Sequence, residues 1–274
     1  MTEPILNMPA LWADLIPVPG PKTHKYMRGH AVILGGERLT GAARLASEAA
    51  MRIGAGLCTI VTAAAAQDVY RQGAAHIMVE TCASLSQFSA HLGDPRRNAV
   101  LIGPGAGQDD PAGLKAAVLE TLALRRKTVL DADALNVFAG DTKDFFGALH
   151  ENCVLTPHEG EFSRLFGGNQ GLDRVIEAAR LCKAVVLHKG ADTMIAHPDG
   201  RVVVNRHSSP FLATAGAGDV LAGLITGLLA QGVPAFDAAC AAAWIHGAAG
   251  IRIGPGLVAP DLIARIPEIL SELM

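Results

Sequence analysis

Short apolar runs rich in β-branched residues alternate along the chain with longer, alanine-rich stretches. Continuous apolar runs are typical of strands covered on both faces, and apolar residues at near-helical spacing, as in residues 43–53, indicate helices. The pattern predicts strands at 31–34, 57–62, 76–80, 99–102, 128–130, 153–155 and 184–187, a hairpin of 194–196 with 202–205, helices at 41–54, 64–73, 111–124 and 172–182, and a mainly helical remainder.

Strands that alternate with helices predict a three-layer α/β/α fold, in which a mostly parallel central sheet has helices on both faces. Right-handed crossovers place the carboxyl ends of the parallel strands at one edge, where open sheets of this kind bind ligands. We therefore expect the residues that follow the predicted strands to meet at one rim: Gly35–Gly36, Gly103–Gly105, Asp131, Pro157–His158 and Lys189–Gly190. Since no internal repeat or linker is visible, residues 1–274 are expected to form a single domain.

Composition narrows the range of partners and compartments. The 274 residues are 50% apolar and carry a net charge of −3, so neither nucleic acid nor an anionic membrane is an expected partner. The most apolar stretch, 220–233, contains glycines and is short for a bilayer span. The N-terminus lacks a basic segment followed by an apolar one, and the five cysteines form no C-x-x-C pair. These features predict a cytoplasmic protein whose cysteines pack as small apolar residues, without a disulfide framework or a zinc ribbon.

The segment Ala213–Asp219, which reads A-T-A-G-A-G-D, carries the strongest chemical signal because it runs directly into an apolar helical stretch. The small residues at 215–218 allow successive backbone N–H groups to approach an anion, and the positive end of the following helix favours a phosphate. A carboxylate in the first helical turn, Asp219, is placed to remove a proton from a substrate hydroxyl. An ordinary capped helix needs fewer small residues, so phosphoryl chemistry on a small molecule is the favoured interpretation.

Other polar clusters at strand ends are weaker signals. Gly103–Gly107 contains G-x-G, but its proline makes it a poor dinucleotide fingerprint, and the chain has no P-loop sequence. His158, Glu159 and Glu161 open a predicted helix, where the two acids either order a hydrated Mg²⁺ near phosphates or simply favour the helix N-terminus. Capping by an aspartate explains either Asp131 or Asp133, and a functional role for the other residues of this cluster, which includes Asn136, stays open.

The turn 189–193 follows a buried strand and is placed to meet a nucleotide phosphate or ribose, although as a motif it has little specificity. The histidines at 24, 197 and 246 are interpreted as structural.

Together these segments resemble the ADP-dependent NAD(P)H-hydrate dehydratase family, a branch of the ribokinase-like fold. The resemblance covers nearly the whole chain, and its specific part is T-P-H-E-G-E-F at 156–162 followed by the G-A-G-D that ends at Asp219. Further matching segments are His24–Lys25, Gly41–Ala43, Gly54–Gly56, Ile102–Gly105, Leu130–Asn136, Lys189–Gly190, Ala213–Gly223 and Ala259–Leu262. The resemblance implies nicotinamide nucleotide repair, in which the S epimer of hydrated NADH or NADPH is dehydrated to NAD(P)H with release of AMP and phosphate.

The same resemblance implies roles for individual residues. Asp219 is the expected base, and the hydrate is expected to contact Ala42 or Ala43, Gly105, His158 and Asp219. The expected contacts of AMP or ADP are Lys189, Gly190, Ala191, Asp192, Thr193 and Gly218. The expected anion hole consists of Ala215, Gly216, Ala217 and Gly218. ADP, or alternatively ATP, is the expected phosphoryl donor, and Mg²⁺ is expected to bridge phosphates with Glu161 contacting it through water.

Two features depart from the family pattern. Many relatives read Gly-Gly-x-Gly-Asp where this chain has Ala215, and alanine keeps the N–H group unless the position requires a positive φ. The family also often carries a fused N-terminal epimerase domain, whereas only a short segment precedes the first predicted strand here, so any epimerase is expected to be a separate chain. Because relatives often form tetramers, a homo-oligomer is expected.

Two alternatives remain open at this point. A kinase of the same fold would phosphorylate a vitamin precursor of the hydroxymethylpyrimidine or thiazole type and stop at a stable ester. His158 favours the dehydratase, because related vitamin kinases tend to have asparagine there. A non-catalytic nucleotide-binding protein is the second alternative, and Asp219 counts against it.

Overall fold

A computed structural model describes residues 4–168 and 171–274 and contains one ten-stranded sheet in the order β1-β10-β9-β8-β7-β6-β5-β2-β3-β4. β9 runs antiparallel to β8 and β10, and the other paired strands are parallel. The strands are β1 (Ile5–Leu6), β2 (His30–Gly35), β3 (Leu57–Ala63), β4 (Met78–Cys82), β5 (Ala99–Ile102), β6 (Lys127–Leu130), β7 (Cys153–Leu155), β8 (Val185–His188), β9 (Thr193–Ala196) and β10 (Val202–Asn205).

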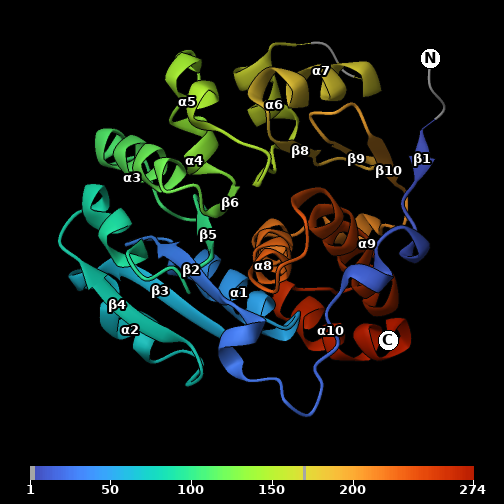
Figure 1. Cartoon of the computed structure of the whole chain (residues 1–274), viewed down its shortest axis with the longest axis horizontal. Helices are drawn as coiled ribbons and strands as arrows, with labels where there is room; N and C mark the ends of the chain where they lie inside the picture. The colour runs from blue at the N-terminus through green and yellow to red at the C-terminus, as the bar shows by residue number, and fades with distance from the viewer. Residues whose placement is uncertain (1–3, 169–170) are drawn as a thin grey trace.

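Helices cover both faces of this sheet (Figure 1). One apolar core contains residues of α1 (Thr40–Arg52), α2 (Gln67–Arg71), α8 (Ala217–Ala230), α9 (Ala235–Ile253) and α10 (Ala259–Leu273). The other contains residues of α3 (Pro111–Ala123), α4 (Asp133–Asn136), α5 (Lys143–Ala148), α6 (Glu159–Phe166) and α7 (Leu172–Cys182), together with the 3-10 segment η5 (Leu85–Leu92). Shorter 3-10 turns are η1 (Pro9–Leu11), η2 (Ala13–Leu15), η3 (Lys25–Arg28), η4 (Ala64–Ala66) and η6 (Pro210–Leu212). The predicted three-layer α/β/α architecture is confirmed.

The continuous apolar runs have a simple explanation in β2. Ala31 and Ile33 belong to one core, Val32 and Leu34 belong to the other, and all four are fully buried. Because successive side chains of a strand point to opposite faces, a strand covered on both sides requires apolar residues throughout.

α8 lies directly against α1, and glycines make this close approach possible. A Cβ atom at Gly223 would lie 2.2 Å from the Ala46 carbonyl oxygen, and one at Gly227 would lie 2.5 Å from that of Ala50. Larger residues would push the two helices apart, so these glycines fix the position of α8, and with it the segment at its N-terminus that the sequence analysis singled out.

The predicted strands are present with boundary shifts of at most two residues, and the hairpin of β9 with β10 is confirmed. The helix expected at 64–73 is shorter, because its first part is the 3-10 turn η4 and only Gln67–Arg71 is α-helical; the other predicted helices shift by at most two residues. The elements β1, η5, α4 and α5 were not predicted. β1 has only two residues, both of them exposed, and it forms because it pairs in parallel with β10, a contact that no local pattern reveals. The helices α4 and α5 have four and six residues, too few to show a 3.6-residue period.

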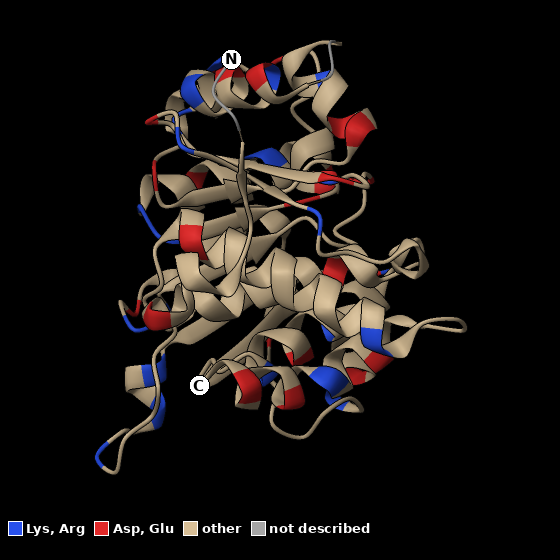
Figure 2. Ribbon diagram, turned by 90° about the vertical axis from the view of Figure 1, so that its right-hand side faces the viewer, with Lys and Arg blue, Asp and Glu red and all other residues tan. Residues whose placement is uncertain are grey.

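The five cysteines are buried, as expected for small apolar residues. Figure 2 shows Lys and Arg interspersed with Asp and Glu on the outer elements, with few charges on the central helices. Within the described ranges, no helix has the length and apolar character needed to cross a membrane.

Candidate active site

The start of α8 is a tight turn built from small residues. Gly216 is the N-cap with a φ of 87°, and a Cβ there would lie 2.6 Å from Leu45 Cδ1 and 2.9 Å from Ala259 Cβ. Both the conformation and the space therefore require glycine at 216. Ala215 is not among the described residues with a positive φ, so alanine in place of the family's glycine causes no backbone strain. No side chain caps this helix, and the Ala217 amide donates to the Thr214 carbonyl at 3.4 Å. The next amides of the first turn, beginning with that of Gly218, are the ones a ligand can meet.

Asp219 lies in the first turn of α8 and is half-buried. The pKa of its carboxyl is raised from 3.8 to about 6, because burial and, after it, the negative charge of Asp131 outweigh the opposing effect of the Lys189 charge. A carboxylate with this pKa is still ionised at neutral pH and is a stronger base than an ordinary aspartate. Such a value is typical of a general base.

Lys189 is the cation beside Asp219. It follows β8, and its Nζ atom lies 2.7 Å from Asp131 Oδ1 and 3.9 Å from Glu161 Oε2. Burial alone would lower the pKa of Lys189, but the carboxylates of Asp131, Glu161 and Asp219 outweigh it and raise that pKa. A Cβ at Gly218 would lie 3.8 Å from Nζ, so the ammonium group is adjacent to the start of α8.

Asp131 is held at the end of β6 by unusual backbone geometry. The next residue, Ala132, has φ 48° and ψ −117°, a conformation that alanine rarely adopts, and its amide donates to Asp131 Oδ1 at 2.9 Å. The Asp131 carbonyl oxygen would lie 1.7 Å from a Cβ at Gly103, so only glycine fits there. Strain of this kind persists where the surrounding structure fixes a functional group.

The other polar residues of the 131–136 segment serve neighbouring loops. Asp133 accepts hydrogen bonds from the Gly107 amide at 2.9 Å and from Gln108 Nε2 at 3.3 Å. Asn136 accepts one from Arg164 at 2.7 Å. The N-cap of α4 is Ala132, without a side-chain cap, so the expected capping by one of these residues is wrong.

His158 and Glu161 form a reciprocal cap at the start of α6. His158 Nδ1 accepts from the amides of Gly160 and Glu161, and Glu161 Oε2 accepts from the His158 amide at 2.9 Å. Because Nδ1 acts as an acceptor, the proton of the neutral ring is on Nε2, and the side chain is 55% exposed. Glu159 instead lies 3.2 Å from His188 Nε2.

Ala42 rather than Ala43 faces the rim. The Ala43 side chain is fully buried in the core beneath α1. Ala42 is partly exposed, and its Cβ would lie 3.2 Å from a Cβ at Gly105, which has a φ of 66°. The residues that follow the strands meet at one rim, as expected. The Lys189 amide donates a hydrogen bond to the Pro157 carbonyl at 2.8 Å. The Gly105 carbonyl lies so close to Gly36 that a side chain at position 36 would clash with it.

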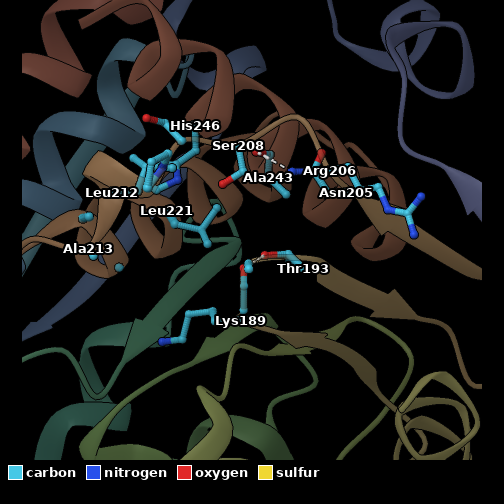
Figure 3. Close-up of a pocket in the computed structure, with 16 residues that line it drawn as sticks. Lys189, Thr193, Asn205, Arg206, Ser208, Leu212, Ala213, Leu221, Ala243 and His246 are labelled. Atoms are coloured by element: carbon cyan, nitrogen blue, oxygen red, sulfur yellow. Dashed lines mark hydrogen bonds between the residues drawn. The ribbon is translucent and has the colours of Figure 1, made fainter. Parts of the chain in front are cut away.

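A cavity of about 670 Å³ opens beside Lys189 and the start of α8. In Figure 3, Lys189 and Thr193 lie on one side of it, and Leu212, Leu221 and His246 lie on the other. Of the expected nucleotide residues, Lys189, Gly190, Ala191, Thr193 and Gly218 line this cavity. Asp192 is not part of the lining and forms an ion pair with Arg206 at 3.0 Å.

Several cavity residues were not anticipated from the sequence. They include Asn205, Arg206, Ser208 and Ser209, and the polar run between a buried strand and the small-residue segment was an available signal. His246, interpreted above as structural, also lines the cavity. It is 8% exposed, its Nε2 has no hydrogen-bond partner among the described residues, and burial lowers its pKa to about 4.

The arrangement combines a carboxylate of raised pKa, a helix N-terminus without a side-chain cap, a half-buried lysine and a cavity of ligand size. These are the components that phosphoryl transfer requires, because catalysis there consists mainly of positioning and of stabilising charge on the transferred group. Within residues 4–168 and 171–274, the structure contains no cluster of three or more His, Cys, Asp or Glu side chains that could hold a metal ion.

Comparisons with known proteins agree with this geometry. The family model for NAD(P)H-hydrate dehydratase matches residues 31–267. The ADP-dependent (S)-NAD(P)H-hydrate dehydratase of Neisseria meningitidis is 38% identical over 89% of this chain and 84% of its own. The Bacillus subtilis ADP/ATP-dependent NAD(P)H-hydrate dehydratase, co-crystallized with ATP/Mg²⁺, superimposes with a TM-score of 0.88 at 26% identity and covers 100% of both chains. A ribokinase-like superfamily protein from Enterococcus faecalis, with a TM-score of 0.85 and 24% identity over 98% of this chain and 96% of its own, shares the fold.

The chain spans about half the length of several curated relatives, which are named bifunctional NAD(P)H-hydrate repair enzymes. The family match nevertheless covers most of the present sequence, and it includes the segments that form the rim and the start of α8. This protein therefore belongs to the NAD(P)H-hydrate dehydratase family.

Proposed function

We propose that this protein is a hydro-lyase that restores NADH or NADPH from the S epimer of the hydrated nucleotide, with ADP or ATP as phosphoryl donor. Residues 1–274 would act as a single ribokinase-like domain. The observation that carries the proposal is Asp219, a base with a pKa of about 6 at the start of α8, beside a cavity large enough for a nucleotide. Family membership supplies the substrate class.

The proposed reaction begins with transfer of the terminal phosphoryl group of ADP to the 6-hydroxyl of the hydrate, which releases AMP. Asp219 takes the hydroxyl proton as the new O–P bond forms, and the amides of residues 215–218 stabilise the charge on the transferred group. Loss of phosphate from C6 and of a proton from C5 then restores the ring double bond. The atoms balance as hydrate plus ADP giving NAD(P)H, AMP and phosphate.

Lys189 would neutralise the nucleotide phosphates, with Gly190–Thr193 and Gly218 completing the nucleotide contacts. Ala42, Gly105 and His158 would hold the hydrate; His158 offers its Nε2 proton as a donor. Mg²⁺ bound between phosphates would reduce their charge, and Glu161 is the residue proposed to contact it through water. Carboxylate oxygens suit Mg²⁺, which proteins commonly hold through one or two carboxylates together with substrate phosphates.

The test is to incubate purified protein with hydrated NADH, Mg²⁺ and either ADP or ATP. The expected result is the return of NADH absorbance with one AMP per NADH when ADP is the donor. If neither donor regenerates NADH, the dehydratase proposal is wrong. A stable phosphate ester formed from a pyrimidine or thiazole alcohol would instead identify a vitamin kinase, and AMP binding without any turnover would identify a nucleotide-binding protein.

The oligomeric state is a separate proposal. By family resemblance we propose a homotetramer, and light scattering of the purified protein measures it directly.

A further inference from the structure

A second cavity, of about 350 Å³, lies at the same edge of the sheet as the first. Its lining includes Gly35 and Ala63 at the ends of β2 and β3, Ala83 after β4, Leu39 before α1, and Gly105 after β5. The volume falls in the range of pockets that bind small molecules, and the site mixes apolar and polar groups as such pockets do. None of the residues proposed to contact the nucleotide donor lines it.

One face of α1 runs from the second cavity, which Leu39 lines, toward the start of α8, where Ala217 and Gly218 line the first. Leu45 contacts the start of α8 at Gly216, and Ala42 lies one helical turn earlier on the same face. Ala42 is adjacent to Gly105, and Gly105 is part of the second cavity. A ligand whose reacting end is near Asp219 and which passes Ala42 and Gly105 therefore leads into the second cavity.

The hydrated nucleotide has this shape, since it is a dinucleotide with its reacting ring at one end and an adenosine at the other. The first cavity must hold the phosphoryl donor during the reaction, so it is not available to the adenosine half of the hydrate. The second cavity includes Gly105, one of the residues proposed to hold the hydrate, and shares no lining residue with the first cavity.

The charged groups at this second cavity are Glu37, Arg38, Asp109 and Asp110. The single cation is already paired, because Arg38 Nε lies 3.2 Å from Asp109 Oδ2. Asp110 lines the pocket and accepts from the Gly113 amide at 2.8 Å as the N-cap of α3. The excess of carboxylates suits the hydroxyl groups of a ribose, which donate hydrogen bonds, and repels an additional phosphate.

Building on the proposed function, we propose that the second cavity binds the adenosine half of the hydrated nucleotide and that its carboxylates make hydrated NADH, with its free 2′-hydroxyl, a better substrate than hydrated NADPH. The charged side chains are exposed, so the preference is limited to roughly two- to fivefold in kcat/KM and decreases with ionic strength.

Two measurements test the proposal. First, kcat/KM is compared for hydrated NADH and hydrated NADPH at low and high salt, in the native protein and in Glu37→Gln. The expected result is a preference for hydrated NADH that narrows with salt and with the substitution. Equal or better use of hydrated NADPH by the native protein overturns the charge argument.

Second, Ala83→Trp fills the cavity, and Ala90→Trp places the same side chain at an exposed position outside it. Ala83→Trp is expected to raise KM for both hydrates about tenfold without changing KM for ADP, while Ala90→Trp leaves both values unchanged. The hydrate of reduced nicotinamide mononucleotide lacks the adenosine half, so its kcat/KM should be the same in native protein and Ala83→Trp. A loss of equal size with this truncated substrate, or no loss with either hydrate, overturns the binding assignment.

These outcomes are distinct from failure of the proposed function. If the native protein converts no hydrate at all, the dehydratase proposal itself is wrong. If it converts the truncated and full-length hydrates but Ala83→Trp affects neither, only the assignment of the second cavity is wrong.

Discussion

Replacement of Asp131 with asparagine removes a buried negative charge without changing the size of the side chain. Asp131 is 2% exposed, lies 2.7 Å from Lys189 Nζ, and is the first charged group that raises the pKa of Asp219 after burial itself. Without that charge, repulsion of the Asp219 carboxylate decreases, and Lys189 loses its closest partner and becomes a better counterion for Asp219. Both effects lower the pKa of Asp219.

The magnitude follows from the cause of the shift. Burial remains in the variant, so the pKa of Asp219 should fall from about 6 by roughly one unit rather than return to 3.8. One unit corresponds to about 1.4 kcal/mol of differential interaction between the two protonation states. Because a weaker base accepts a proton less readily, kcat at neutral pH should also decrease.

The assay is the pH profile of kcat/KM for hydrated NADH with saturating ADP. The acid limb should lie near pH 6 in native protein and about one unit lower in Asp131→Asn. Asp133→Asn is the matched control, since Asp133 bonds to the Gly107 amide and is not a cause of the Asp219 shift. An acid limb that stays in place in Asp131→Asn, or moves equally in both variants, would refute the electrostatic reasoning.

Four further predictions concern the same region. Asp219→Ala should reduce turnover by at least about 10²-fold while AMP affinity in calorimetry stays nearly unchanged; retained turnover would mean that another group is the base. The pKa of Asp219 is higher in the folded state, so its stabilising contribution is present below pH 3.8 and is lost as the pH rises through about 6. Asp219→Ala should therefore have a larger free energy of unfolding than native protein at pH 7.5, by at most about 3 kcal/mol. At pH 3.5 this difference should be absent. Gly216→Ala should lower the free energy of unfolding, measured with denaturant, by roughly 1–3 kcal/mol and should reduce activity. Ala215→Gly should leave activity within about twofold of that of native protein. Equal effects of the two substitutions would contradict the geometry of the turn. The pKa of His246 is lowered from 6.5 to about 4, so the stability that depends on its neutral ring is lost as the pH falls from 6.5 to about 4. In His246→Phe the decrease in Tm over this pH interval should be smaller. An unchanged slope of Tm against pH would contradict the burial of His246 as a neutral ring.

Local pattern was sufficient to predict most of the architecture, and particular residues show why. The apolar run at 31–34 has a single explanation, burial on both faces, and the two cores divide its side chains alternately. The turn at 215–219 was visible because a helix start that approaches a ligand closely needs small residues, and Gly216 has the positive φ that such a turn requires. Elements of a few residues, such as β1, were not visible because their stability comes from a distant partner.

The sequence by itself determined the three-layer architecture, the edge of the sheet at which polar residues meet, and Asp219 as the candidate base. Only the tertiary structure decided how that base is tuned, because its pKa depends on burial and on Asp131 and Lys189. These two residues are far apart in the chain and meet at one edge of the sheet, after the ends of β6 and β8. The tertiary structure also decided that Ala42 faces the site while Ala43 is in the core, and that His246 borders the cavity. Periodicity reports which face of an element is buried, whereas electrostatic interaction depends on distances across the fold, which one-dimensional spacing does not contain.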